Sequence, residues 1–134
     1  MTQEEKELLI KDLCARLPYS GVQIHISYED GFKYDKTLTY DDVKNYSQLP
    51  ACSTTMVKPY LRPLSSMTKS ERKEFDDLSK FDEDVWMGNH KVGFPKQARI
   101  MSKCVDWLDR KMFDHRGLIP KGLALEAKEG MYNN

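Results

Sequence analysis

Two stretches of alternating apolar and polar residues lie on either side of Asp30-Gly31 and limit the folds open to this chain. A period of two is typical of β-strands with one buried face. An Asp-Gly step between two such stretches is typical of a two-residue hairpin turn. We therefore predict an antiparallel hairpin. Its apolar positions are Val22, Ile24, Ile26 and Tyr28 before the turn and Phe32, Tyr34, Leu38 and Tyr40 after it, with Lys36 interrupting the second set.

A third strand is expected because two strands alone are marginally stable in water. The best candidate is the segment 52–58, CSTTMVK, in which Thr54, Thr55 and Val57 are β-branched. The connector that follows contains Pro59 and Pro63. Prolines interrupt both helices and central strands, so we predict an extended connector there.

Helices are predicted on both sides of the strands. Thr2 and Glu5 form a capping box that opens a helix before Pro18, and Thr68 and Glu71 form another that opens a helix to about residue 81. The last helix is predicted from Pro95 to about residue 113. It carries two adjoining apolar stripes, Met101, Val105, Leu108 and Met112 in one and Ile100, Cys104 and Trp107 in the other.

These elements predict an α+β fold made of an N-terminal helix, a small antiparallel sheet and a helical C-terminal half. Neither half carries a full set of core residues, so a single domain over residues 1–134 is expected. The apolar residues of the tail, Leu118, Ile119, Leu123 and Leu125, are expected to pack back on the core.

The bulk composition argues against several classes of function. Lys and Arg total 21 and so do Asp and Glu, so no overall attraction to nucleic acid or an anionic membrane is indicated. The three cysteines are widely spaced, which argues against a disulfide framework and a structural zinc site. The N-terminus is acidic where a signal peptide is basic, and no apolar run is long enough to span a bilayer. We expect a cytoplasmic protein without metal, cofactor or membrane contact.

Catalytic residues are not indicated by any recognised motif. The histidines are few, and His115 follows Asp114 at the end of the last predicted helix. There a protonated imidazole is favoured by the helix dipole, so we interpret His115 as a capping residue, with general acid–base catalysis as the alternative. The sequence favours a non-enzymatic role but leaves catalysis open as the alternative.

A binding surface is the remaining possibility, and residues 91–121 carry more basic than acidic side chains. Trp107 falls between the apolar stripes and a basic stripe on the last helix. It is either a core residue or a contact for a partner, because aromatic and basic side chains together bind nucleic acid or anchor a protein. The candidate contacts are Trp107, Trp86, Lys96, Arg99, Lys103 and Arg110.

Three segments carry a resemblance to a known group of proteins. They are VKPYLRPLSSMT at 57–68, DWL at 106–108 and FDHRGLIPKGLA at 113–124. They resemble motifs of short, uncharacterised proteins from gut Bacteroidales genomes, including Bacteroides, their prophages and their mobile elements. The resemblance implies a bacterial or phage origin and a cytoplasmic setting, and it implies no activity.

Together these observations predict an accessory protein that binds another protein through its C-terminal half. The alternatives are a nucleic-acid-binding protein that uses the basic face of the 96–113 helix, and a small enzyme built around His115 and Asp114. The sequence leaves the oligomeric state and the identity of the partner open.

Overall fold

The computed structural model describes residues 1–19, 21–79 and 90–132, with only the backbone over 90–97. Within these residues, four strands form one mixed sheet in the order β2-β1-β3-β4, which confirms the α+β class with an N-terminal helix and a helical C-terminal half. The described elements are α1 (Gln3–Arg16), β1 (Gln23–Ser27), β2 (Lys33–Thr37), α2 (Tyr40–Ser47), β3 (Met56–Leu61), a 3-10 turn (Leu64–Ser66), α3 (Lys69–Leu78), α5 (His90–Arg110) and β4 (Leu125–Glu126).

The predicted hairpin is present, with a turn one residue longer than expected. Ile26 of β1 lies opposite Tyr34 of β2. The Tyr28 N–H donates to the Phe32 carbonyl at 2.8 Å, so three residues form the loop instead of two. Gly31 has φ +87°, as the last residue of a three-residue hairpin loop requires. The strand also ends before Tyr40, which begins α2 instead.

The third strand is present but lies later in the chain than predicted, and it contains Pro59 in a central position. Hydrogen bonds alternate along β1, and the N–H and C=O of Ile24 point toward β2. Pro59 lies opposite Ile24 on β3, so these two residues form no hydrogen bond with each other. The proline nitrogen therefore faces the β4 side, where pairing starts only at Tyr60. The missing N–H interrupts no ladder bond, which explains why the proline is tolerated.

The C-terminal segment completes the sheet in a way that the sequence did not indicate. The two-residue strand β4 pairs in parallel with β3, Leu125 lying opposite Tyr60. Further along, the Tyr132 hydroxyl donates to the Tyr60 carbonyl at 2.7 Å and accepts the Gln23 N–H at 2.8 Å. This hydroxyl bridges β1 and β3.

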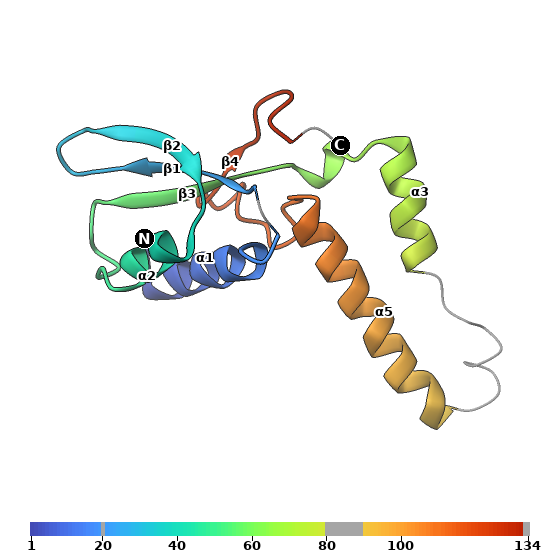
Figure 1. Ribbon diagram of the computed structural model, residues 1–134. Helices are drawn as coiled ribbons and strands as arrows, with labels where there is room; N and C mark the ends of the chain where they lie inside the picture. The colour runs from blue at the N-terminus through green and yellow to red at the C-terminus, as the bar shows by residue number, and fades with distance from the viewer. Residues whose placement is uncertain (20, 80–89, 133–134) are drawn as a thin grey trace.

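The main core lies between the sheet and helices α1 and α2, which run beneath it in Figure 1. The capping boxes at Thr2 and Thr68 are present as predicted, and a third one at Thr39 opens α2. The prediction that the tail packs on the core is confirmed, since Leu118 and Leu123 are buried in it. Core residues from the helices and strands include Leu9, Leu13, Ile24, Ile26, Val43, Tyr46, Val57 and Leu61.

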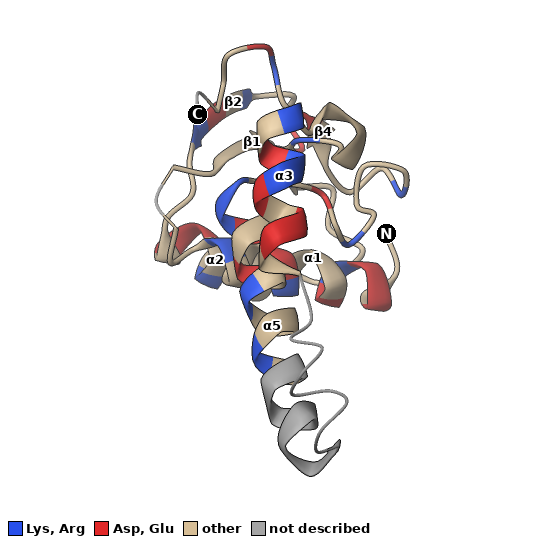
Figure 2. Ribbon diagram, turned by 90° about the vertical axis from the view of Figure 1, so that its right-hand side faces the viewer, with Lys and Arg blue, Asp and Glu red and all other residues tan. Residues whose placement is uncertain are grey.

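Helices α3 and α5 extend away from this body as an arm, seen in Figure 1 and after a quarter turn in Figure 2. Helix α5 begins at His90, so Pro95 lies inside the helix and not at its start as predicted. The predicted core stripe holds only near the body. Leu108 and Met112 are buried, whereas Met101 is 66% exposed and Val105 is 40% exposed because the helix there has run beyond the sheet.

Among the described residues, no helix combines the length and the apolar character that crossing a membrane requires.

Candidate binding surface

The residues predicted as contacts on the last helix divide into two groups. Trp107 is only 1% exposed: its ring packs on Phe113 and Phe75 at centroid distances of 5.8 and 5.5 Å, and its indole N–H donates to Glu74 at 2.9 Å. It is therefore a core residue, and its interpretation as a surface contact is corrected. The basic side chains of Arg99, Lys103 and Arg110 are exposed. Trp86 and the side chain of Lys96 lie outside the described residues.

The junction of α1 with the end of α5 is a buried charge network. The Arg16 side chain is fully buried and donates to both carboxylate oxygens of Asp12 at 2.9 and 3.0 Å. The same guanidinium donates to the backbone carbonyls of Asp109 at 3.3 Å and Phe113 at 2.7 Å. Arg116 donates to Asp12 at 2.7 Å and to Asp109 at 2.9 Å. Two cations and two carboxylates are thus paired where α1 meets α5.

His115 takes part in this junction, whereas Asp114 binds the backbone of the turn that follows it. The His115 Nε2 lies 2.7 Å from the Asp109 carboxylate. Burial opposes ionisation of Asp109, but the hydrogen bonds from His115 and Arg116 outweigh it and lower the Asp109 pKa to about 2. Asp114 accepts the backbone N–H groups of Leu118 and Ile119 at 2.8 and 2.9 Å. These bonds support a structural role for the FDHRG segment.

The proline connector contributes a second ion pair to the same region. Arg62 donates to both oxygens of Glu71 at 2.8 and 2.6 Å, and its guanidinium lies 4.1 Å from the Phe113 ring centroid. Hydrogen bonds from Arg62 and Thr68 lower the Glu71 pKa to about 2 despite partial burial. Arg62 and Arg116, which are close in space through their shared neighbours at the end of α5, therefore pair with carboxylates of three helices, Glu71 of α3, Asp12 of α1 and Asp109 of α5.

A cluster of exposed aromatic rings lies at the far end of the hairpin. We call it the aromatic patch, and it comprises Tyr28, Phe32 and Tyr34, which are 40%, 62% and 37% exposed. Their ring centroids lie 5.6 to 6.3 Å apart, and the two tyrosine hydroxyls lie 3.3 Å from each other. From the sequence these rings are ordinary strand residues. These rings are exposed because the helices beneath the sheet end before they reach the turn. Local sequence patterns do not predict which part of a sheet the helices cover.

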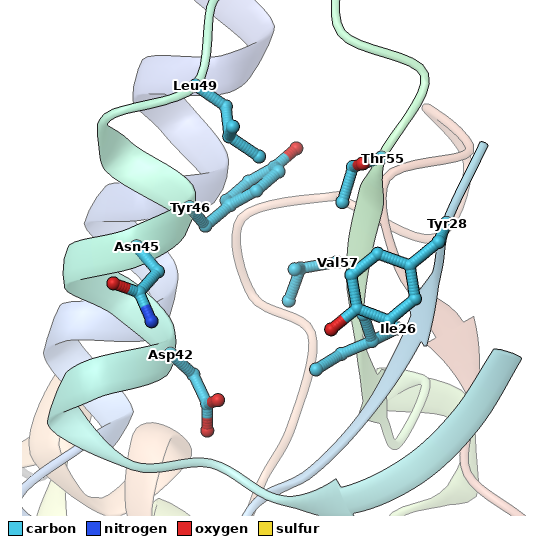
Figure 3. A pocket seen from close by; sticks show the side chains of 8 residues that line it. All are labelled: Ile26, Tyr28, Asp42, Asn45, Tyr46, Leu49, Thr55 and Val57. Carbon is cyan, nitrogen blue, oxygen red and sulfur yellow. The ribbon is translucent and has the colours of Figure 1, made fainter. Parts of the chain in front are cut away.

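A cleft adjoins the aromatic patch, between α2 and the strands (Figure 3). We call it the hairpin cleft; its volume is about 320 Å³, at the small end for ligand sites. Its strand side is apolar, with Ile26 and Val57, whereas Asp42 and Asn45 point into it from α2. Tyr28 belongs to both the cleft and the patch, so the two form one continuous surface. The remaining lining residues are Tyr46, Leu49 and Thr55.

The one carboxylate of the hairpin cleft is already neutralised. Burial raises the pKa of Asp42, but bonds from Lys36 and Thr39 outweigh this and leave the pKa below its usual value. The Lys36 ammonium lies 2.9 Å from the carboxylate, which also caps α2. The cleft therefore offers apolar surface and neutral polar groups more than net charge.

The opposite face of the sheet carries a second polar cluster. Asp35 of β2 is 2.8 Å from His25 Nδ1 and accepts from the Tyr60 hydroxyl at 3.0 Å and from Lys128 at 3.3 Å. The hydrogen bond from His25 is the largest cause that lowers the Asp35 pKa. These contacts tie the hairpin to β3 and to the tail. Sequence reasoning missed the cluster because its members come from four distant segments.

Within the described ranges, no group of three or more His, Cys, Asp or Glu side chains is placed to hold a metal ion. Comparisons with protein-family models, with curated proteins and with solved structures found no match for this chain.

Proposed function

We propose that this chain is a non-enzymatic interaction protein that binds another protein through the aromatic patch and the hairpin cleft. The observation that carries the proposal is the set of three mutually contacting exposed rings beside an open apolar cleft. Single exposed apolar side chains are ordinary, but a contiguous patch marks an interaction site. The bacterial, phage or mobile-element origin and the cytoplasmic setting implied by the resemblance belong to the same proposal.

The chemistry of the surface favours a protein partner. Tyrosine and phenylalanine side chains present a large contact area with few rotatable bonds, so little conformational entropy is lost on binding. The apolar strand side of the cleft suits a side chain inserted by the partner, and Asn45 and Thr55 supply neutral polar groups around it. Because Asp42 is paired with Lys36, binding is expected to depend weakly on salt.

Nucleic-acid binding is the alternative that one observation favours, namely the exposure of Arg99, Lys103 and Arg110 on α5. The acidic residues of the neighbouring α3 counter this basic charge (Figure 2). Burial of Trp107 also removes the aromatic side chain that was expected to stack on bases. Binding of this kind would weaken steeply as salt is added.

Quantitative capture with matched variants tests the proposal. Tagged wild-type protein is compared with Phe32→Ser/Tyr34→Ser and with Arg99→Glu/Lys103→Glu, in nuclease-treated lysate of the native host. All four side chains are exposed, so both variants should keep the wild-type melting temperature. We expect the wild type and the α5 variant to capture the same partner protein. The amount captured by the hairpin variant should be at least tenfold lower.

Loss of the captured protein in the α5 variant alone would contradict the proposal and place the contact on the arm. Recovery of nucleic acid without nuclease, abolished in the α5 variant and by added salt, would favour the alternative function.

A further inference from the structure

We infer that the exposed edge of β2 pairs with β2 of a second copy of this chain, in an antiparallel register centred on Tyr34. The inference rests on the proposed function, because it assigns one partner to the same face. It starts from the place of β2 at the end of the strand order, with β1 as its only neighbour in the sheet that the described residues form. Figure 1 shows β2 as the outermost strand.

The direction of the peptide groups follows from two bonds at the ends of the hairpin. Tyr28 donates to Phe32, and Leu38 donates to Val22. Since antiparallel strands alternate in hydrogen bonding, the even-numbered residues of β2 bond to β1. The peptide groups of the odd-numbered residues point outward, and they are those of Lys33, Asp35 and Thr37. All three residues are exposed, so the edge is open to a further strand.

The charges on β2 select one register for a two-fold pairing. Centring the pair on Tyr34 places Lys33 of each copy opposite Asp35 of the other, so two opposite-charge pairs form between outward-bonding residues. Centring on Lys33 or Lys36 places two lysines face to face, and centring on Asp35 does the same with two aspartates. Centring on Thr37 pairs neither Lys33 nor Asp35 with an opposite charge on a strand. Only the Tyr34 register is complementary.

The side chains suit this register on both faces of the sheet. The Asp35 carboxylate already bonds to His25, Tyr60 and Lys128, but its side chain is still 37% exposed, so Lys33 of the second copy can reach it as a further partner. On the helix-covered face the two Tyr34 rings become a directly opposed, non-hydrogen-bonded pair, the closer of the two pair types. Phe32 comes opposite Lys36 of the second copy, where a lysine stem and ammonium pack on an aromatic ring. The edge is short, so the dimer is expected to be weak and to form as concentration rises.

Disulfide trapping tests the register directly. In a background with Cys14, Cys52 and Cys104 replaced by serine, Tyr34→Cys places two thiols opposite each other, within the range that a disulfide spans. Thr37→Cys is the matched control, because in this register residue 37 of one copy lies opposite residue 31 of the other, so the two thiols are too far apart to join. We expect Tyr34→Cys to form covalent dimers under mild oxidation at least tenfold faster than Thr37→Cys.

Sedimentation equilibrium of the otherwise unaltered chain provides the second readout. Lys33→Glu converts both attractive pairs into repulsive ones and should weaken self-association about tenfold. Lys58→Glu, on the same face but on β3, should leave it unchanged. Equal trapping of both cysteine variants, or a monomer at every concentration, would overturn the inference. If partner capture still required Phe32 and Tyr34 in that case, the proposed function would stand and only the second copy would be rejected.

Discussion

At the scale of single residues, the charged side chains of the interior account for how the helices are joined. Arg16 is buried without any exposed atom on its side chain, and its bonds reach Asp12 and two backbone carbonyls near the end of α5. Buried charges contribute little net stability as a pair, but removal of one partner leaves the other unpaired in a low-dielectric interior. The network therefore specifies the docking of α1 on α5 more than it strengthens the core.

Replacement of Arg16 is the sharpest test of this network. Arg16→Ala leaves Asp12 with Arg116 alone and removes the donor to the Phe113 carbonyl, so we expect a loss of about 3–5 kcal/mol in the free energy of unfolding. The matched control is Arg72→Ala, because the Arg72–Asp76 pair is exposed, and it should change stability by less than about 0.5 kcal/mol. Urea denaturation measures both. Similar losses in the two variants would show that the buried network has no special role.

At the scale of elements, local patterns predicted what each segment forms, and tertiary contacts decided where it ends. The alternation around Asp30-Gly31 predicted the hairpin. It did not predict the third loop residue, because that depends on the hydrogen bonds from the Tyr28 N–H to Phe32 and from the Gly31 N–H to Tyr28. β3 can include Pro59 because neither β1 nor β4 offers an acceptor that an N–H at this position would bind. β4 has only two residues, which is too short for any periodicity.

The candidate site was harder to predict than the elements. Helical spacing placed Trp107 beside a basic stripe, but only the packing of Phe75 and Phe113 shows that its ring is buried. The aromatic patch depends on an absence of cover over the hairpin end, which follows from helix lengths and crossing positions. A single sequence gives neither the exact helix ends nor the way the helices cross the sheet, so the aromatic patch could be found only in the folded structure.

At the scale of the whole molecule, the two carboxylates with pKa values of about 2 predict how stability changes with acidity. Asp109 and Glu71 have ordinary pKa values of 3.8 and 4.5, and the fold lowers both. Their stabilising effect is therefore complete above about pH 5 and is lost as the pH falls toward 2. For Asp109 the loss is on the order of 2 kcal/mol.

Urea midpoints at pH 6, 4 and 3 measure this loss. Glu71→Gln should lower stability at pH 6 and flatten the decline between pH 6 and 3, since its side chain no longer titrates. Asp41→Asn, at an exposed carboxylate, is the control and should keep the wild-type slope. An unchanged slope in Glu71→Gln would show that the Arg62–Glu71 pair does not govern the acid response.

We place the contact between two copies of this chain at the outer edge of β2. Residue-resolved amide hydrogen exchange of β2, in dilute and in concentrated protein, tests it most directly. We predict fast exchange at Lys33, Asp35 and Thr37 in dilute protein and clear protection at high concentration, with Tyr34 and Lys36 protected in both. Identical exchange of the outward amides at all concentrations, with protection appearing on α5 instead, would contradict the account.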